Sequence, residues 1–383
     1  MKSPPSLSRI QKIGMSSGLD SVGIANAEIF KSTLQDLTKR KSKGLHAGMS
    51  FTYRNPERST NPKLAMPECK SLIVGAKSYW EPSLEKSRTG SPTGRVALYA
   101  RQDHYGALRV GLESIAEELV DAGYDARILI DDNALVDREA AYRAGIGWYG
   151  KNSNILIPKR GSWFVLGSVL TNAGYQPNKP LKDGCGSCTQ CITSCPTDAI
   201  VSPGVLDANR CLAWLVQSEG DFPTEFRTAL GDRIYGCDDC QEVCPTNKFE
   251  ERLNNSFGLS SSESVISIHK IFESDDDSLL AEFGRWYIPK RDPRYLKRNA
   301  LIVLGNSKMP PSSKTIKIVK KCLAGSDEML RAHAVWTAKR LGLDKLLIGL
   351  EGDPSPSVQK ELAQKVEGNT HSQGEESDLA WIG

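Results

Sequence analysis

The 383-residue sequence predicts a mixed α and β fold in three parts. The first part is α/β or α+β, because segments with helical and strand periodicity alternate up to about residue 171. The second part is loop-rich, and its residues 180–248 hold eight of the ten cysteines. The third part, from about residue 289, has the pattern of paired helices. A chain of this length is expected to form two or three domains rather than one core.

Each element of the first part has its own sequence signal. Gly18 and Gly123 follow helical patterns and suit helix C-termini, and the apolar run of "KSLIVGAKSY" predicts a buried strand. A phosphate-binding glycine loop of either common form is not found. The expected elements are a helix at 6–18, a strand at 70–79, a helix at 105–123, a strand at 125–131, a helix at 135–145 and a hairpin at 154–172.

The C-terminal part contains a short internal repeat. "DPRYLKRNALIVLGN" and "SDEMLRAHAVWTAKRLG" are similar and lie about 35 residues apart, and "DPSPSVQKELAQKVEG" is a poorer third copy. This periodicity predicts an α-helical repeat of the HEAT kind. The expected boundaries are an α/β (α+β) domain at 1–175, a cysteine-rich domain at 176–250, a connection at 251–288, a HEAT-like helical domain at 289–367 and a disordered tail at 368–383.

The composition, 39% hydrophobic and 25% charged, is typical of a globular protein. No apolar run approaches the ~20 residues that a membrane-spanning helix needs. The N-terminus shows no apolar segment, cleavage pattern or twin arginine of an export signal. We therefore expect a cytoplasmic protein with reduced thiols, whose ten cysteines serve metal or redox chemistry rather than disulfides.

The cysteines form two runs with a spacing typical of iron–sulfur proteins. The first run is C-x2-C-x2-C-x3-C-P, and the second is C-x2-C-x3-C-P preceded by a detached cysteine. In ferredoxins with two [4Fe–4S] clusters, the cysteine before the proline of each run binds the other cluster. This rule predicts a ferredoxin-like domain with one cluster on Cys185, Cys188, Cys191 and Cys244 and a second on Cys195, Cys211, Cys237 and Cys240.

Structural zinc is the simpler alternative for so many cysteines. Zinc sites usually pair two close cysteines with two distant ones, which differs from three cysteines at x2 spacing followed by x3-C-P. Iron–sulfur ligation is therefore favoured. Cys69 and Cys322 lie outside both runs and are expected to be ordinary small apolar residues.

Several motifs in consistent order resemble the epoxyqueuosine reductase family. They include "IDDNALVDREAAYRAGIGWYGKN", "GSWFVLGSVLTN", the cysteine block and "GDRIYGCDDCQEVCPTNK", and the similarity runs from about Met49 to Leu343. The resemblance implies an oxidoreductase that reduces the epoxide of epoxyqueuosine to the alkene of queuosine at the wobble position of tRNA. It also implies cobalamin, two [4Fe–4S] clusters, an external low-potential electron donor and the last step of queuosine biosynthesis.

The resemblance also implies where cobalamin binds, between the α/β domain and the ferredoxin-like domain. The D-x-H-x-x-G signature of a histidine-ligated corrin is absent from the sequence, as the resemblance implies. The glycines of "AGIGWYGKNSNI" would allow a large planar ligand to approach the backbone closely. The implied cobalamin contacts are Arg54, Tyr99, Asp131, Lys151, Asn152, Ile155 and Asp238.

Asp131 is the residue that the resemblance implies as proton donor. It follows the predicted strand "RILI", where a side chain can face a pocket, and breaking an epoxide C–O bond requires an acid to protonate the oxygen. We expect burial to raise its pKa, so that the carboxyl is protonated when needed. An aspartate at this place can also be only a helix cap, and Asp132 and Asp137 are alternative candidates.

Positive charge is concentrated in one stretch of the sequence. Arg285 to Cys322 contains eleven Lys and Arg residues and a single acid, Asp292. Such a stretch is either the solvated face of a repeat helix or a surface for RNA phosphates, and the resemblance favours tRNA. The expected tRNA contacts in this stretch are Lys290, Arg291, Arg294, Lys297 and Arg298. Outside it, Arg138 is expected to bind the tRNA substrate or to orient Asp131.

Two other functional classes share some of these features. A reductive dehalogenase would use the same cofactors, but it would lack the basic helical repeat and would often carry a twin-arginine leader. An electron-transfer ferredoxin fused to a scaffold domain would not need the "GWYGKN" segment and would not bind cobalamin. We expect a monomer that binds tRNA carrying epoxyqueuosine in the anticodon and does not bind a membrane.

Overall fold

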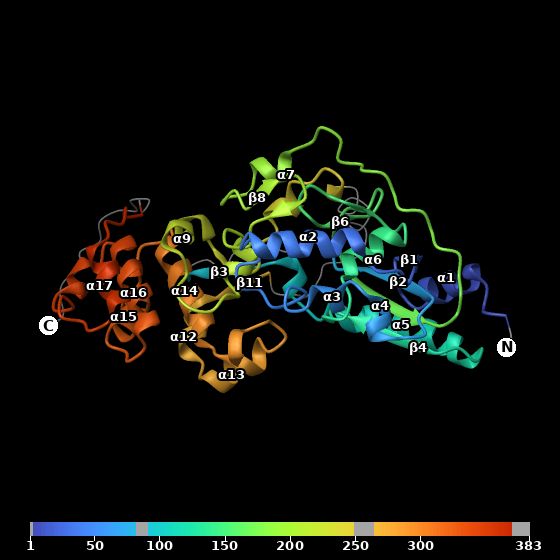
Figure 1. Cartoon of the computed structure of the whole chain (residues 1–383). Helices are drawn as coiled ribbons and strands as arrows, with labels where there is room; N and C mark the ends of the chain where they lie inside the picture. The colour runs from blue at the N-terminus through green and yellow to red at the C-terminus, as the bar shows by residue number, and fades with distance from the viewer. Residues whose placement is uncertain (1–2, 82–90, 249–263, 370–383) are drawn as a thin grey trace. The chain divides into compact units, whose positions relative to one another are not determined.

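The computed structural model describes residues 3–81, 91–248 and 264–369 (Figure 1). The chain divides into two compact units. The described residues of unit 1 are 3–81, 98–211 and 238–248, and those of unit 2 are 91–97, 212–237 and 264–369. The segment expected to be ferredoxin-like is thus shared between the units. Residues 251–263 of the expected connection and 370–383 of the expected disordered tail lie outside the described residues.

Unit 1 is built on a four-stranded sheet in the order β1-β2-β7-β4, with every pair antiparallel. The antiparallel pairing makes this unit α+β rather than a parallel α/β fold. Ile24, Ile73, Val169 and Ile128 stand opposite one another and form one apolar row across all four strands. The strands are β1 (Ser21–Asn26), β2 (Ser71–Ser78), β4 (Ala126–Ile130) and β7 (Phe164–Thr171).

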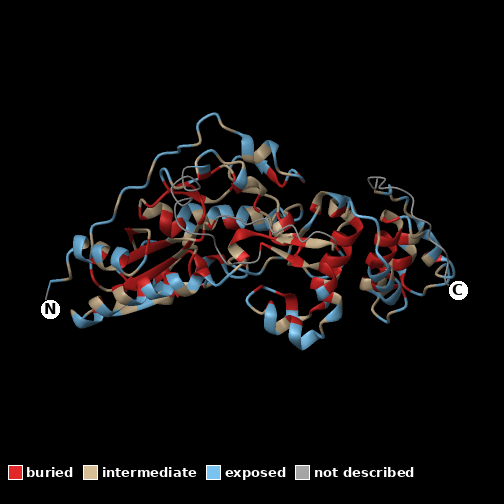
Figure 2. Cartoon of the chain, turned by 180° about the vertical axis from the view of Figure 1, so that it is seen from behind, coloured by how far each residue is buried: buried red, intermediate tan, exposed pale blue. Residues whose placement is uncertain are grey.

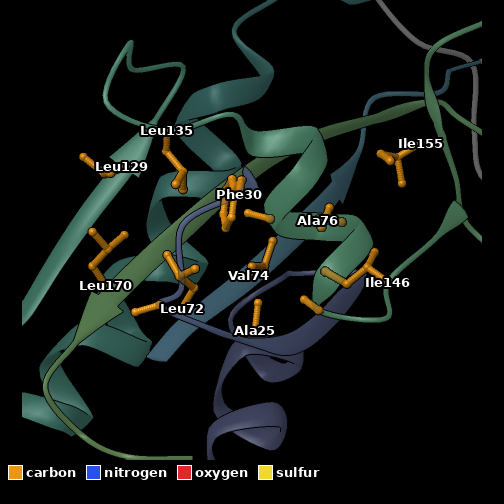
Figure 3. Close-up of a cluster of buried hydrophobic side chains, with 14 of the residues drawn as sticks. Ala25, Phe30, Leu72, Val74, Ala76, Leu129, Leu135, Ile146, Ile155 and Leu170 are labelled. Carbon is orange, nitrogen blue, oxygen red and sulfur yellow. The ribbon is translucent and has the colours of Figure 1, made fainter. Parts of the chain in front are cut away.

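Helices cover both faces of this sheet because its strands alternate apolar side chains to either side. Helices α1 (Leu7–Ser16) and α5 (His104–Asp121) pack on the face that carries Ile73 and Val169. Helix α6 (Asp137–Arg143) packs on the opposite face, where Leu72, Val74 and Leu170 join Leu135 and Ile146 in a second core (Figure 3). The expected helices at 6–18, 105–123 and 135–145 and the expected strands at 70–79 and 125–131 are therefore confirmed.

The predicted hairpin at 154–172 is wrong. Strand β6 (Ile155–Leu156) pairs with β5 (Trp148–Tyr149), whereas β7 enters the central sheet, and only the bridge between Ile157 and Gly161 remains of the hairpin. The apolar run of β7 needs two neighbouring strands and burial on both faces, which a surface hairpin does not supply. The other elements of unit 1 are α2 (Lys31–Ser42), α3 (Pro56–Ser59), α4 (Pro62–Ala65), η1 (Leu98–Ala100), α7 (Gln190–Thr193), β8 (Ile200–Ser202), β9 (Val205–Leu206) and α10 (Asp239–Glu242).

Unit 2 begins with a small sheet in the order β10-β3-β11. Tyr235 of this sheet stacks on Trp286, which in turn stacks on Phe283. The elements of this part are β3 (Thr93–Val96), α8 (Leu212–Leu215), α9 (Thr224–Leu230), β10 (Arg233–Tyr235), β11 (Val265–Ser267), α12 (Ile268–Glu273), α13 (Asp276–Glu282) and η2 (Pro289–Arg291).

The rest of unit 2 is helical. Helices α14 and α17 pack on α16, and α15 packs beside it around a shared apolar core (Figure 2). Thr337 of α16 donates to the carbonyl of Leu301 in α14 at 2.9 Å, which fixes the two helices against each other. The helices are α14 (Arg294–Asn306), α15 (Ser313–Leu323), α16 (Glu328–Arg340), η3 (Asp344–Leu347) and α17 (Pro356–Ala363). None of the helices in the described ranges could cross a membrane.

Candidate iron–sulfur and catalytic site

The two cysteine runs have the same local structure in the parts of them that belong to unit 1. Each has a four-residue helix, α7 or α10, with Cys191 in the first and Cys240 in the second. After the first helix the backbone N–H of Cys195 donates to the carbonyl of Ile192 at 3.3 Å. After the second helix the N–H of Cys244 donates in the same way to the carbonyl of Gln241 at 3.0 Å. The carbonyls of the same two cysteines then accept from the N–H three residues further on, at 3.2 and 3.0 Å. The two runs are therefore structural repeats, and α7 and α10 pack against each other.

The thiol of Cys191 lies among the other cysteines that the spacing assigns to one cluster. Burial raises its pKa, and Cys244, Cys185 and Cys188 raise it further, in that order. The cysteine before the proline of the second run is thus grouped with the first three of the first run. Thiolates gathered in this way repel one another, and bound iron removes the repulsion because a cation stabilises the deprotonated sulfur.

The donor set of this group fits a [4Fe–4S] cluster. Among the described residues no group of three or more His, Cys, Asp or Glu side chains could hold a metal ion. A cluster does not need such a group, because each of its four thiolates binds a different iron. Of the second predicted ligand set, Cys195, Cys211 and Cys240 belong to unit 1 and Cys237 belongs to unit 2, so this set stays a prediction. Cys69 is buried outside both runs.

A buried polar network holds the second cysteine run against the central sheet, and the sequence analysis missed it. Asn247 accepts from the N–H of Ser162 at 2.6 Å and donates to the carbonyl of Gln241 at 2.7 Å. Gln241 donates to the hydroxyl of Tyr79, just beyond β2, at 3.0 Å. A side chain at Gly161 would collide with Asn247, which explains the glycine there. The only sequence signal was the asparagine of "CPTN".

Asp131 lies at the end of β4 in a strained backbone conformation. Its φ of 49° is in the left-handed region, which costs a non-glycine residue about 1 kcal/mol and is often retained at functional sites. The residue as a whole is exposed, yet burial of its carboxyl raises the pKa and Asp132 raises it further. The direction of this pKa shift is the one expected for a proton donor, while the catalytic role stays a prediction.

The two alternative aspartates differ from Asp131 in their contacts. Asp132 accepts from the N–H of Ala134 at 2.8 Å, which closes the loop before α6 and gives Asp132 a structural role. Asp137 begins α6, and its buried Oδ1 has no hydrogen-bond partner in the described residues. Burial raises its pKa well above the usual value, followed by Asp131 and Asp132. An acid at a helix start is common, so the sequence did not single out Asp137.

Tyr105, at the start of α5, also lies near these carboxyls and was missed. The exposed fraction of this residue is 39%, but burial of the phenol raises its pKa, and Asp131 and Asp137 raise it further. Arg138 acts in the opposite direction on this phenol. Arg138 itself donates to the carbonyl of Ser153 at 3.2 Å, so it links α6 to the turn after β5.

The predicted cobalamin contacts fall into two groups. Arg54 is exposed, and its loop is joined to the Asp131 loop by the N–H of Thr52, which donates to Asn133 at 3.0 Å. Asp238 accepts from the N–H of Leu98 at 2.5 Å, next to Tyr99 in η1. The loops of these residues are thus fixed by hydrogen bonds within unit 1.

The second group of predicted contacts is engaged inside the protein. The side chain of Ile155 is 5% exposed and belongs to the core, so only its backbone could reach a ligand. Asn152 is 6% exposed and donates to the carbonyl of Cys240 at 3.3 Å. Lys151 donates to the carbonyls of Gly186 and Cys188. Gly147 and Gly150 approach Leu156 and Asn152 closely, so their lack of a side chain serves the fold as well.

The predicted tRNA contacts of unit 2 also differ among themselves. Arg298 is fully buried, and the prediction that it contacts phosphates is wrong. It donates to the carbonyls of Leu215, Ser218 and Gly220 and so serves the core of unit 2. Its helix turns this side chain inward, which charge along the sequence does not reveal.

The remaining basic residues lie nearer the surface and are paired with other groups. Lys290 bonds to Glu219, Arg294 to Asp292 and Asp327, and Lys297 to Asp276. Arg291 donates to the carbonyls of Gly284 and Leu280. Exposed ion pairs contribute about 0–1 kcal/mol each and can exchange an acid for a phosphate at little cost. These residues stay candidates for tRNA contacts.

Comparisons with known proteins support the cysteine chemistry. Residues 184–247 match the family model of the 4Fe-4S double cluster binding domain. The repeated cysteine runs and this match define the class as iron–sulfur proteins with a double cluster.

Similarity over most of the chain defines the family within that class. The chain is 34% identical over 335 residues to an epoxyqueuosine reductase of Bacillus cereus, a match that covers 85% of this chain and 87% of the relative. It resembles a crystal structure of epoxyqueuosine reductase with an epoxyqueuosine-modified tRNA-Tyr stem loop (TM-score 0.81, 29% identity, 93% and 96% covered). The chain belongs to the epoxyqueuosine reductase family.

A second solved structure is also similar to this chain. It is the Bacillus subtilis epoxyqueuosine reductase, described with the aspartate catalytic loop swung out of the active site (TM-score 0.82, 28% identity, 93% and 96% covered).

Proposed function

We propose that this protein reduces epoxyqueuosine in tRNA to queuosine. The observation that carries the proposal is the family relationship over most of the chain, joined to the grouping of Cys185, Cys188, Cys191 and Cys244. Opening the epoxide to an alkene consumes two electrons and two protons and releases the oxygen as water. The protein must therefore bring an electron path and a proton donor to one modified base.

The electron path in this proposal consists of two [4Fe–4S] clusters. Cys185, Cys188, Cys191 and Cys244 hold one cluster, and Cys195, Cys211, Cys237 and Cys240 hold the other. An external low-potential donor supplies the electrons. Cobalamin, when bound near Arg54, Tyr99, Asp131 and Asp238, supplies a reduced cobalt centre that can transfer electrons to the epoxide.

Asp131 supplies the proton in this proposal. Its carboxyl is the group of the loop with a raised pKa that also projects from an exposed, strained residue. A protonated carboxyl can donate to the epoxide oxygen as the C–O bond breaks, and such general acid catalysis contributes about 10²–10⁴-fold. Asp132 is engaged in closing the loop, which favours Asp131 over its neighbour.

The helices of unit 2 bind the tRNA as a HEAT-like domain in this proposal. Lys290, Arg291, Arg294 and Lys297 contact phosphates, and Arg138 contacts the substrate near Asp131. The base must be splayed out of the anticodon loop to be reduced, as base-modifying enzymes require. The protein acts as a monomer in the cytoplasm.

The experiment that tests this proposal is a single-turnover assay under anaerobic conditions. Purified protein, loaded with iron, sulfide and cobalamin and reduced chemically, is incubated with an epoxyqueuosine-modified tRNA-Tyr stem loop. We expect the nucleoside to lose one oxygen atom in mass spectrometry. Loaded protein that leaves the nucleoside unchanged would contradict the proposal, and turnover of an aryl halide instead would favour a dehalogenase.

Cobalamin uptake separates the proposal from the non-enzymatic alternative. An absorption spectrum with iron–sulfur bands that does not change on addition of cobalamin would favour an electron-transfer protein. We expect corrin bands to remain with the protein after gel filtration.

A further inference from the structure

The short turn between β5 and β6 contacts both cysteine runs, at residues that belong to unit 1. The turn is residues 150–154 and is rigid, because the N–H of Gly150 donates to the carbonyl of Asn154 at 2.8 Å and the N–H of Ser153 donates to that of Gly150 at 2.9 Å. Strands β5 and β6 pair on either side of it. The backbone positions from which the side chains of this turn project are therefore fixed.

Lys151 in this turn holds the first cysteine run. Its Nζ donates to the carbonyl of Gly186 at 2.6 Å and to that of Cys188 at 2.9 Å. The two carbonyls lie on either side of Ser187, so one ammonium fixes the loop between the first two predicted ligands. Hydrogen bonds from a charged donor are stronger than those between neutral groups.

Asn152, the next residue, holds the second cysteine run. Its Nδ2 donates to the carbonyl of Cys240 at 3.3 Å, and its Oδ1 accepts from the N–H of Asn154 at 3.2 Å. The second bond fixes the orientation of the amide group, so that the donor points to α10. The side chain is 6% exposed, and its contacts are therefore with the protein.

Trp148 of β5 adds a third contact, to the residue before Cys185. A side chain on Gly184 would lie 2.6 Å from the Trp148 ring, so the backbone approaches the indole more closely than any other residue allows. The strand and the turn thus contact the first cysteine run at two places, and the turn contacts the second run as well.

We propose that this turn positions both clusters: Lys151 orders the ligand loop of the Cys185 cluster and raises its reduction potential, and Asn152 orders the helix that carries Cys240. The inference rests on the proposed two-cluster assignment. A positive charge close to a cluster favours its reduced state, because that state carries one more negative charge. The two clusters are thereby given different potentials by adjacent residues of one turn.

Substitutions of Lys151 separate ordering from charge. We expect Lys151→Met to lose up to about half of the bound iron, since one of two four-iron clusters is affected. Lys151→Gln keeps a donor but no charge, so it retains iron and shifts the midpoint potential of one cluster to a more negative value. Lys151→Arg restores both properties. The measurements are iron content and a potentiometric titration followed by electron paramagnetic resonance.

Lys182→Met is the matched control. Lys182 is an exposed lysine three residues before Cys185, and it makes no hydrogen bond or ion pair in the part of the chain that the structure describes. We expect wild-type iron content and unchanged potentials for both clusters. A shift as large as that of Lys151→Gln would show that any nearby charge acts in the same way, and would overturn the specific role of Lys151.

Asn152→Ala tests the second part of the proposal, the role of Asn152. We expect it to affect the cluster that Lys151→Gln leaves unchanged, by loss of iron or by a broadened resonance signal. Asn154→Ala is its control, because only the backbone N–H of Asn154 takes part in the contact. If both substitutions change the same cluster, the division of roles within the turn is wrong.

The outcomes distinguish this inference from the proposed function. Wild-type protein without bound iron would contradict the proposed function itself. Wild-type protein with two clusters, together with Lys151→Met and Lys151→Gln variants of unchanged iron content and potential, would overturn the inference alone. If those variants instead lose cobalamin uptake, Lys151 is a corrin contact, as the sequence resemblance implies.

Discussion

The cysteine runs and the basic stretch of α14 are both rich in one kind of residue, but the fold treats them differently. In the cysteine runs, side chains distant in sequence are gathered, and Cys244 joins Cys185, Cys188 and Cys191. In the basic stretch, similar residues that are close in sequence lie in different environments. Arg298 is fully buried, whereas Arg294, four residues earlier, pairs with acids near the surface.

This difference shows what a sequence pattern must contain to assign a role to each residue. Ligand spacing is a geometric condition, because thiolates at x2 spacing can surround one group only in a compact turn. A run of charge sets no such condition, since a helix turns successive residues toward different environments. The spacing therefore predicts a role for each cysteine, while charge predicts a role for the basic residues only as a group.

Removing one predicted ligand from each run is the strongest test of this comparison. We expect Cys244→Ala and Cys191→Ala to remove the same cluster, with up to about half of the iron and all turnover lost, although these cysteines belong to different runs. Resonance spectra of the two variants would then be alike. Cys322→Ala is the control, and different residual spectra for the first two would contradict the crossed assignment.

Replacing Asp131 tests the residue whose local backbone is strained. We expect Asp131→Asn to lower the turnover rate by about 10²–10⁴-fold, because the amide cannot supply the acidic proton. Iron content and cobalamin uptake should be unchanged. Asp125→Asn, on an exposed loop beside Asn172, is the control for a lost carboxylate. Full activity of Asp131→Asn would exclude Asp131 as the acid and direct attention to Asp137.

Two arginines of α14 test the buried and exposed parts of the basic stretch. We expect Arg298→Met to lower the free energy of unfolding by about 3 kcal/mol or more, because buried carbonyls of 215–220 lose their donor. Burial lowers the pKa of Arg298 to about 10, so the lost group is charged at neutral pH. Arg294→Gln should change stability by less than about 1 kcal/mol.

The exposed arginine of this pair, Arg294, tests tRNA binding. Arg294→Gln should weaken binding of the stem loop and reduce its salt dependence, since one phosphate contact is lost. Chemical denaturation and a binding titration at two salt concentrations measure both properties. If Arg294→Gln binds as wild type at both concentrations, the basic surface lies elsewhere.

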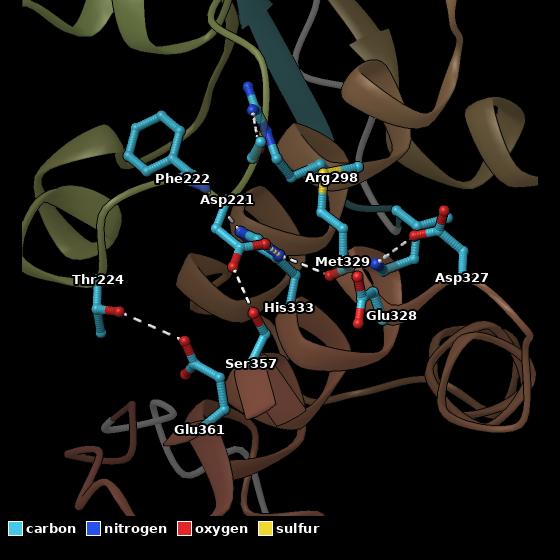
Figure 4. A network of polar contacts seen from close by, with 12 residues as sticks. Asp221, Phe222, Thr224, Arg298, Asp327, Glu328, Met329, His333, Ser357 and Glu361 are labelled. Atoms are coloured by element: carbon cyan, nitrogen blue, oxygen red, sulfur yellow. Dashed lines mark hydrogen bonds and ion pairs between the residues drawn. The ribbon is translucent and has the colours of Figure 1, made fainter. Parts of the chain in front are cut away.

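His333 gives a smaller expected effect than Arg298, on the pH dependence of unit 2. Its Nε2 accepts from the N–H of Phe222 at 3.1 Å, and its Nδ1 donates to the carbonyl of Met329 at 2.7 Å (Figure 4). This arrangement requires the neutral ring. Burial lowers the pKa of His333 well below the usual value, and Arg227 lowers it further.

The sign of the pH effect follows from this lowered pKa. At pH values below about 6.5 the unfolded state binds a proton that the folded state does not, so stability falls as the pH falls. The contribution of His333 is up to about 1.4 kcal/mol per pH unit. The difference in the free energy of unfolding between pH 7.5 and pH 5.5 should be smaller for His333→Asn than for wild type. An equal pH dependence in both proteins would show that other groups control it.

Much of the fold was predictable, with one instructive exception. The strand of β2 and the helices α1, α5 and α6 were expected from their periodicity and are confirmed. The hairpin at 154–172 was wrong because both of its apolar segments have strand character, and the sequence does not state which strand each one pairs with. Strand pairing between distant segments is a tertiary property.

The sequence by itself determined the family and the double-cluster spacing of the cysteines, because these depend on residue types at short, fixed spacings. Only the tertiary structure decided that Arg298 belongs to the core and that Lys151 and Asn152 contact the cysteine runs. The physical reason is that burial and hydrogen-bond partners come from segments far away in the chain. The local spacing of residues does not indicate which of those segments will surround a given side chain.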